Sequence, residues 1–459
     1  LQGCCCKGHM RMKLMSWMIR LRLLSLIFVY SCITTGYPAR LPSRKVLLFS
    51  SSFHTPKLQS VKNDDIVSED NNSLESPYIR KFPRYRVDLT RSSASSKSNN
   101  IWNQWKGAWD KASLLRRLQQ RYSSSMSVSW FEDMTGVKAL STMWKIMAET
   151  CISSSPSCIV AFPDCDGQIL QNFKEIVDWI NEFMPKELVL TVTIMESQVM
   201  KIERKTNPRN IQHTHDRALP DVVEKRTKSW VKRMLVDLAI CPFTKSVTKS
   251  GQGLSDVGVP VGNISYHTSD ANNIYQLLAD TWEAINNMLE AGPSGRDGIS
   301  SILLSVPFYD DDFSYWSGPI FTVIESCVVA AQAEGLIGVV CFHPSYATPD
   351  GTSWPGFGHM HSVPRLEGWV TTAMATTTTT TTATKINSIN YSREDLAAGG
   401  AWQRRTPHAT INVLRADQLE RAESRRNSPE LYTRNIQLMM EIGNEKLQEA
   451  LEQERRLLS

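Results

Sequence analysis

A short apolar run that ends in a histidine and a proline constrains the fold of this chain most strongly. The run is Gly338-Val339-Val340-Cys341-Phe342-His343-Pro344. Its apolar part predicts a buried strand, which must end at Pro344 because proline has no backbone N–H to donate to a neighbouring strand. Residues two apart share one face of a strand, so Cys341 and His343 should point the same way. We therefore expect a strand that carries the imidazole of His343 to the edge of a sheet.

The residues around this run alternate between helical and strand patterns, which predicts an α/β protein. The C-terminal domain should hold a mixed sheet of about four strands with flanking helices. The expected strands are 259–266, 302–306, 337–342 and 410–414, and the expected helices are 224–240, 274–289, 313–333 and 429–457.

A smaller α/β segment precedes that domain and has the same order of helices and strands. Its expected elements are a helix over 138–149, a strand over 158–162, a helix over 169–184 and a strand over 188–194. The stretch from Trp144 to Pro163 is similar to the stretch from Trp282 to Pro307. An internal duplication and a chance similarity both explain this, because alternating helices and strands are common. A duplicated first copy would lack the histidine.

Composition divides the chain further. Residues 61–100 are polar and rich in serine and asparagine, and they have too little apolar surface for a core. An insert over 347–400 contains a threonine run from Thr376 to Thr382, which predicts a surface loop or a disordered segment. The expected regions are 1–36, a signal peptide; 37–100, a transit-like segment and disordered linker; 101–205, the small α/β segment; 206–223, a linker; and 224–459, the C-terminal domain.

The first hundred residues predict targeting to a membrane-bounded compartment. Basic residues precede an apolar segment over 21–33, followed by Thr34, Thr35 and Gly36, as in a signal peptide. Residues 37–62 are rich in serine and basic side chains and contain no acid, as in a transit peptide. This two-part leader is similar to those of algae with secondary plastids, so we expect a plastid location. The alternative is an ordinary secreted or membrane-anchored protein of the secretory pathway, and membrane contact is expected only through an uncleaved leader.

Charge and cysteine content exclude some classes of protein. Residues 1–63 hold ten of the 51 Lys and Arg residues and no Asp or Glu, so the rest has 41 basic against 46 acidic residues. A mildly acidic body lacks the basic surface of a nucleic-acid-binding protein, and we expect no nucleic-acid partner. The ten cysteines show neither disulfide-framework nor metal-ligand spacing, so we expect reduced thiols.

Four short motifs resemble an uncharacterised family of short, mostly bacterial proteins with a domain of unknown function. The motifs are Cys241-Pro242-Phe243, Phe342-His343-Pro344, Arg405-Thr406-Pro407 with Thr410 and Leu414-Arg415, and Tyr432-Thr433-Arg434-Asn435. The resemblance covers residues from about 228 to 445 except the insert. The family usually has Ser-Pro-Tyr-Pro-Thr where this chain has Thr406-Pro407-His408-Ala409-Thr410. No reaction comes with the resemblance.

The candidate site residues follow from the expected sheet. Ligands of open α/β sheets bind beyond the carboxyl ends of the strands, where His343 could act as an acid or base. The alternative is a ring that bonds a neighbouring backbone group. Cys241 is a weaker catalytic candidate, because a helix C-terminus disfavours a thiolate. The favoured alternative is a small buried apolar side chain.

Charged residues should lie at the same edge as His343. Asp310, Asp311 and Asp312 follow a strand and could hold a divalent metal, or one of them could cap the next helix. Arg405 and Arg415 could bind a carboxylate or phosphate with paired guanidiniums, or form internal ion pairs.

These residues indicate an enzyme or binding protein for a small anionic metabolite in an organelle. The alternative is a non-catalytic structural or assembly module. The sequence predicts neither the reaction nor the oligomeric state.

Overall fold

The computed structural model describes most of the chain after residue 100. The described residues are 101–122, 126–134, 136–184, 188–196, 198–206, 219–331, 333–350, 362–377, 391–423 and 428–458. All of them belong to one compact unit that spans 51–459. The expected signal peptide, transit-like segment and disordered linker lie outside the described residues, as does most of the expected linker over 206–223. None of the described helices is long and apolar enough to cross a membrane.

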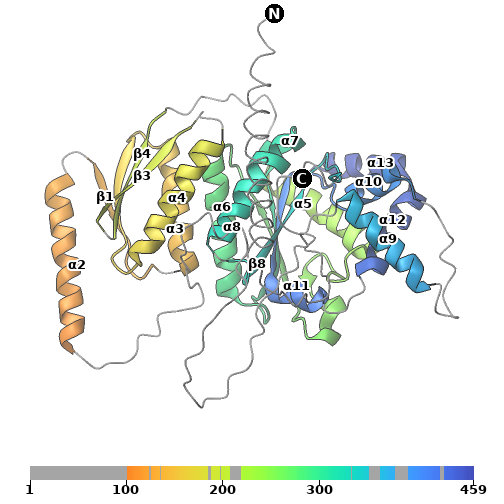
Figure 1. Ribbon diagram of the computed structural model, residues 1–459, viewed down its shortest axis with the longest axis horizontal. Helices are drawn as coiled ribbons and strands as arrows, with labels where there is room; N and C mark the ends of the chain where they lie inside the picture. Colours follow the sequence, from red (N-terminus) through yellow and green to blue (C-terminus); the bar gives the residue numbers. More distant parts are fainter. Residues whose placement is uncertain are drawn as a thin grey trace, which may run out of the picture. The chain divides into compact units, whose positions relative to one another are not determined.

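The α/β prediction is confirmed, since the chain forms two mixed sheets with helices packed on them (Figure 1). The first sheet has the order β1-β2-β4-β3 and the second the order β5-β6-β7-β9-β8. The strands of the first sheet are β1 (Ser127–Trp130), β2 (Ser157–Ala161), β3 (Leu190–Glu196) and β4 (Val199–Arg204). Those of the second are β5 (Lys249–Ser250), β6 (Gly262–Thr268), β7 (Ile299–Ser305), β8 (Ile337–Phe342) and β9 (Thr410–Arg415).

Three helices pack on the first sheet. Helix α2 (Ile101–Tyr122) covers one face, where its Leu114 and Leu118 pack with residues of β2 and β4. Helices α3 (Gly136–Ile152) and α4 (Gly167–Phe183) contribute to the main core. Asp166 caps the N-terminus of α4, because its side chain accepts a hydrogen bond from the Gln168 backbone N–H.

The second sheet is packed by more helices. Before β8 lie α5 (Pro220–Trp230), the π-helical turn η2 (Val231–Asp237), the 3₁₀ turn η3 (Gln252–Val257), α6 (Ile274–Ala291), the 3₁₀ turn η4 (Pro307–Tyr309), α7 (Phe313–Tyr315), the π-helical turn η5 (Trp316–Ile320) and α8 (Phe321–Ala330). After it lie α9 (Val363–Thr377), α10 (Arg393–Trp402), α11 (Ala416–Glu423), α12 (Ser428–Ile442) and α13 (Asn444–Arg455). The single helix expected over 429–457 is broken between α12 and α13, because Gly443 has a positive φ of 86° that a helix cannot accept.

The two sheets share one topology. In each sheet a parallel pair, β1 with β2 or β6 with β7, comes first, and two antiparallel pairings follow. The helices α3 and α6 connect the parallel strands in the two segments, and α4 and α8 follow them. The order β1-β2-β4-β3 therefore matches β6-β7-β9-β8, with β5 as an added edge strand.

The register extends this match to single residues. We align Phe162-Pro163 of the first segment with Val306-Pro307 of the second. The pairing of β2 with β4 and of β7 with β9 then makes Arg204 of β4 equivalent to Arg415 of β9. Arg204 donates hydrogen bonds to the carbonyl oxygens of Thr150, Cys151 and Ser153 at the end of α3, at 3.2, 2.7 and 2.9 Å.

Arg415 does the same for the second segment. Its guanidinium donates to the carbonyl oxygen of Met288 in the last turn of α6 and to that of Ile299. Alignment of Trp144 with Trp282 also aligns Thr150 with Met288, so the two arginines have equivalent carbonyl partners. An arginine at a helix C-terminus satisfies carbonyls that have no partner within the helix. This shared detail supports the internal duplication that the sequence suggested.

The two segments also share a core. Helix α3 packs against α6, and α4 against α8. Trp144 and Trp282 are both about 1% exposed and belong to the same apolar cluster. The small segment is therefore packed on the larger one through the helices that are equivalent in the two copies.

The insert over 347–400 differs from the expected loop. Its described part contains α9 and most of α10 (blue in Figure 1), and both pack against α12. Val363, Leu366 and Val370 of α9 form an apolar cluster with Leu396 and Ile436. The threonine run obscures this pattern, because the apolar residues that anchor α9 lie ahead of it. Residues 351–361 and 378–390 lie outside the described residues.

We predict that Leu366→Ala destabilises the protein by about 2–5 kcal/mol, as expected for removal of a buried leucine side chain. Leu366 is 0% exposed. Thr371→Ala, on an exposed position of the same helix, should change the free energy of unfolding by less than about 0.5 kcal/mol. Urea denaturation measures both values. Equal, small effects would show that α9 is not part of the folded core.

Candidate functional site

The candidate site lies where β7 and β8 end and β9 begins. In the first segment, residues 197 and 198 alone separate β3 from β4. In the second segment, residues 343–409 separate the equivalent strands β8 and β9. This long connection carries His343, Arg405 and His408 to one edge of the sheet, and nothing in the first segment corresponds to it.

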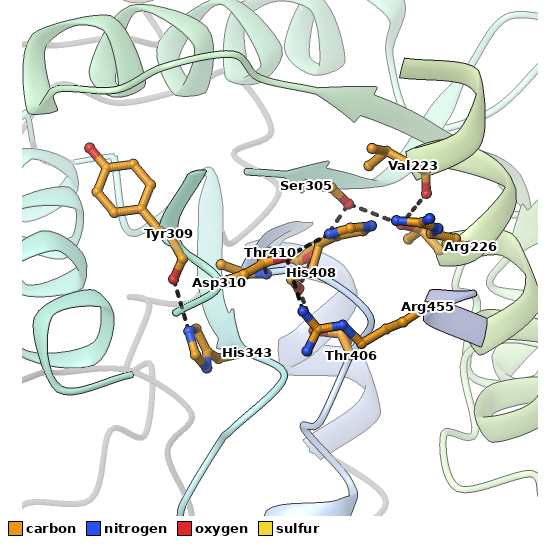
Figure 2. A network of polar contacts seen from close by, with 12 residues as sticks. Val223, Arg226, Ser305, Tyr309, Asp310, His343, Thr406, His408, Thr410 and Arg455 are labelled. Atoms are coloured by element: carbon orange, nitrogen blue, oxygen red, sulfur yellow. Dashed lines mark hydrogen bonds and ion pairs between the residues drawn. The ribbon is translucent and has the colours of Figure 1, made fainter. Parts of the chain in front are cut away.

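His343 is fully buried and its ring bonds backbone on both sides. The Ser345 backbone N–H donates to Nδ1 at 3.0 Å, so Nε2 carries the proton and donates to the Tyr309 carbonyl oxygen at 2.9 Å. Figure 2 shows the contact with Tyr309. Burial lowers the pKa of His343 and outweighs the opposing effects of the Tyr309 carbonyl and of Asp310. This geometry matches the alternative in which the His343 ring bonds neighbouring backbone groups. The ring connects the end of β8 to the turn after β7.

The guanidinium of Arg405 has no counter-ion in the part of the chain that the structure describes. Its Nε donates to the Tyr346 carbonyl oxygen at 3.0 Å, and its Cζ lies over the Trp402 ring, 4.3 Å from the ring centre. Among the residues that the structure describes, its two terminal nitrogens have no hydrogen-bond partner. Burial lowers the pKa of Arg405, and no neighbouring charge opposes that effect.

A pocket opens beside this guanidinium, with a volume of about 410 Å³. Its wall consists of the turn after β8, Arg405 and one side of α13, and the residues that line it are Pro344, Ser345, Arg405, Gln448, Leu451, Glu452, Arg455 and Arg456. The carboxylate of Glu452 bonds two neighbouring side chains, since it accepts hydrogen bonds from Gln448 at 3.1 Å and from Arg456 at 2.9 Å. Three arginines against one glutamate give the lining a net positive charge.

Asp310 and His408 form a hydrogen-bonded pair between the end of β7 and the start of β9 (Figure 2). Asp310 accepts a hydrogen bond from His408 Nδ1 at 2.8 Å and another from the Ala409 backbone N–H at 2.7 Å. The side chain of His408 is 4% exposed and that of Asp310 is 10% exposed. Arg455, which lines the pocket, lies 3.8 Å from the same Asp310 oxygen that binds His408.

The position of Arg455 depends on the docking of α13. Arg233 of η2 binds both carboxylate oxygens of the buried Glu454, at 2.7 and 2.9 Å. Arg226 of α5 donates from Nε to the Leu457 carbonyl oxygen at 3.0 Å. Burial lowers the pKa of Arg226, the charge of Arg455 lowers it further, and the charge of Asp310 raises it. Arg226, Arg455 and Asp310 are therefore electrostatically coupled.

The three aspartates have separate surroundings. Asp312 caps α7 through a 3.0 Å hydrogen bond from the Tyr315 backbone N–H, which is the capping alternative, and Asp311 is exposed. The described part of the chain contains no group of three or more His, Cys, Asp or Glu side chains arranged to hold a metal ion.

Arg415 lies at the other end of the sheet. Because β9 runs antiparallel to β8, Arg415 pairs with Ile337 at the start of β8, while Thr410 pairs with Phe342 at its end. The expectation that Arg405 and Arg415 share one edge is thus corrected, and the two guanidiniums cannot bind one anion together.

The thiol of Cys241 is surrounded closely enough that burial raises its pKa, which favours the neutral form.

The other motif residues mainly hold backbone. Asn435 of α12 donates to the Ile240 carbonyl oxygen at 2.8 Å and to Gln403 at 3.0 Å. Arg434 donates to the carbonyl oxygen of Ala239, a non-glycine residue with a positive φ of 51°. The Trp230 indole donates to the Arg405 carbonyl oxygen at 2.6 Å. The motifs therefore converge and fix the loops from which Arg405 and His408 extend.

A family model described as "Protein of unknown function (DUF1415)" matches residues 222–354. The resemblance to an uncharacterised family is confirmed for this stretch, which is less than a third of the chain. It includes the Cys241-Pro242-Phe243 and Phe342-His343-Pro344 motifs and ends before Arg405 and His408. No curated protein and no solved structure gave a significant match.

Sequence reasoning missed His408, Arg455 and Arg226 as site residues. One signal was that His408 departs from the tyrosine of the family's motif. A second signal was the repeated Asp-x-Asp after the equivalent strands, at Asp164 and Asp166 and again at Asp310 and Asp312. The contact between Asp310 and His408 spans 98 residues, which no local pattern reveals.

We predict that His343→Ala lowers the free energy of unfolding by about 2 kcal/mol or more, because it leaves the Tyr309 carbonyl and the Ser345 N–H without their partner. The unfolded histidine takes up a proton near pH 6.5, whereas the folded one, with its lowered pKa, does so only in stronger acid. Acid therefore favours the unfolded wild type, and the cost of the substitution should shrink as the pH falls from about 7 towards 5. Urea denaturation at several pH values measures this, and an unchanged stability would contradict a structural role.

Proposed function

We propose that the second segment binds a small anionic metabolite through a carboxylate or phosphate group held by Arg405. The observation that supports this most is the partly desolvated guanidinium whose terminal nitrogens have no partner among the described residues. Partial burial of a cation without an anionic partner costs desolvation free energy. An anion that binds to Arg405 would offset this cost.

The orientation of Arg405 supports the same ligand class. The Nε hydrogen bond to Tyr346 and the contact of Cζ with the Trp402 ring restrain the guanidinium. Two parallel N–H groups then remain for two oxygens of one ligand, which is the geometry that carboxylates and phosphates accept. Arg455 and Arg456 add positive charge at the same pocket. A volume of about 410 Å³ falls in the range of small-molecule sites.

The non-catalytic alternative also has support from particular residues. His343, Arg415 and Asn435 all bond backbone groups and stabilise the fold. Arg405 differs from them, because only its Nε bonds backbone.

We predict that malonate or inorganic phosphate raises the melting temperature of the full chain, because a ligand that binds only the native state stabilises it. Arg405→Lys should remove at least half of that increase, since an ammonium cannot bind two oxygens with a planar fork. Differential scanning fluorimetry at matched ionic strength measures the change.

The matched control is Arg296→Lys, which alters an exposed arginine in the loop before β7. It should leave the anion effect unchanged. If neither anion stabilises the wild type, or if both variants respond as the wild type does, the anion site at Arg405 does not exist.

A further inference from the structure

The pocket beside Arg405 follows one side of α13 for about two helical turns. The residues that line it there are Gln448, Leu451, Glu452, Arg455 and Arg456. Neighbours three or four positions apart lie on the same side of a helix, so these side chains form a single row. From residue 448 to residue 456 a helix rises by about 12 Å. The pocket is therefore long enough for a molecule with a different contact at each end.

The four charged side chains of the lining leave two cations without a compensating anion. Arg456 donates to the Glu452 carboxylate at 2.9 Å, so the charges of this pair largely cancel. Arg405 and Arg455 remain. Arg405 comes from the connection between β8 and β9, whereas Arg455 is the last residue of α13. The two cations thus reach the pocket from different parts of the fold.

Arg455 lies near Asp310 but makes no hydrogen bond to it (Figure 2). Their closest nitrogen and oxygen are 3.8 Å apart, which is longer than a hydrogen bond. The Asp310 carboxylate already accepts from His408 and from the Ala409 backbone N–H. Among the described residues, the Arg455 side chain has no hydrogen-bond partner, and it is 41% exposed. Its N–H groups are therefore available to a ligand in the pocket.

A closed ion pair elsewhere in the chain shows the contrast. Asp164, which follows β2 in the first segment, contacts Lys111 of α2 at 2.6 Å and accepts from the Asp133 backbone N–H. There the cation contacts the carboxylate directly. At Asp310 an imidazole and a backbone N–H make the direct contacts, and the cation lies farther away.

The C-terminus of α13 is satisfied by cations of another helix. Unpaired carbonyls at a helix C-terminus carry partial negative charge, which disfavours an anion close by. Arg226 of α5 donates to the Leu457 carbonyl oxygen at 3.0 Å, and Lys225 donates to that of Leu458 at 2.6 Å. These two contacts offset the negative end of the helix, so the charge of Arg455 is not needed there.

We propose that the ligand of this pocket carries two acid groups, one held by Arg405 and the other by Arg455. This inference rests on the proposed anion site and narrows its ligand class to small diacids, such as dicarboxylates and phosphorylated carboxylic acids. Leu451 lies one helical turn before Arg455, and with Pro344 it gives the lining its apolar surface. A short hydrocarbon chain between the acid groups matches that surface. Charge-assisted hydrogen bonds at both ends then fix the orientation of the ligand.

Matched pairs of acids test this, because the members of each pair have equal numbers of carbons and differ in the second carboxylate. The pairs are propionate with malonate and butyrate with succinate. Isothermal titration calorimetry of the full chain, near neutral pH and at fixed ionic strength, measures Kd. We expect at least one diacid to bind about tenfold more tightly than its monoacid, since a hydrogen bond to a charged group contributes this much or more.

Variants identify the second contact. Arg455→Gln should reduce the preference for the diacid to about twofold or less, because the second acid group loses its cation. It should leave the weaker binding of the monoacid at Arg405 nearly unchanged. The matched control is Lys446→Gln, which removes the same charge from an exposed position of α13 outside the pocket. This variant should keep the wild-type preference, because an exposed charge outside the site is screened by salt.

The outcomes separate this inference from the proposed function. Equal binding of monoacid and diacid, or a preference that survives in Arg455→Gln, overturns the second contact and leaves the site at Arg405 standing. Loss of the preference in Lys446→Gln also overturns it, since a general field would then explain the effect. If none of the four acids binds, the anion site fails and this inference fails with it. Should Arg455→Gln not fold, the wild-type pairs still decide, because equal affinities contradict the inference and a tenfold preference supports it.

Discussion

The candidate site depends on how the buried carboxylate of Asp310 is neutralised. Two hydrogen bonds, from the Ala409 N–H and from His408, join the end of β7 to the start of β9. They add to two other contacts that fix the return of the long connection to the sheet, the hydrogen bond from the Val306 N–H to the Ala409 carbonyl oxygen at 2.7 Å and that from the Trp230 indole to the Arg405 carbonyl oxygen. Positive charge adds to these bonds. Arg455 lies near the Asp310 oxygen that accepts from His408, and the charge of Asp310 raises the pKa of Arg226. A carboxylate with a side chain only 10% exposed has lost most of its contact with water, and these partners replace that contact.

The two segments together separate scaffold from function. Arg204 and Arg415 hold the ends of α3 and α6, and their equivalence identifies a structural role that no single copy would have shown. What the first segment lacks is the connection over 343–409, which carries both Arg405 and His408; in the first segment only residues 197 and 198 separate the equivalent strands. The site thus arises from an addition to a repeated fold. The helices that position it, α12 and α13, come from the end of the chain and have no counterpart among the described residues of the first segment.

Sequence patterns predicted the parts of the fold that have strong apolar periodicity. The strand over 337–342 was placed correctly because all its side chains are buried. The strands β1, β4 and β5 were missed because they are short or carry polar residues on one face. Local sequence patterns do not predict the direction of a strand within a sheet. Strand β9 runs antiparallel to β8, and this direction places Arg415 at the opposite end of the sheet from Arg405. The pairing of Asp310 with His408 is a tertiary contact, so only the structure could bring His408 into the site.

The central claim is that the chain has one anion site, built around Arg405 in the second segment. Isothermal titration calorimetry of the full chain with malonate tests this most directly. The account predicts one site per chain, lost in Arg405→Ala, because the equivalent edge of the first segment is closed by a short turn and by the Lys111–Asp164 ion pair. Two sites per chain, or one that persists unchanged in Arg405→Ala, would contradict it.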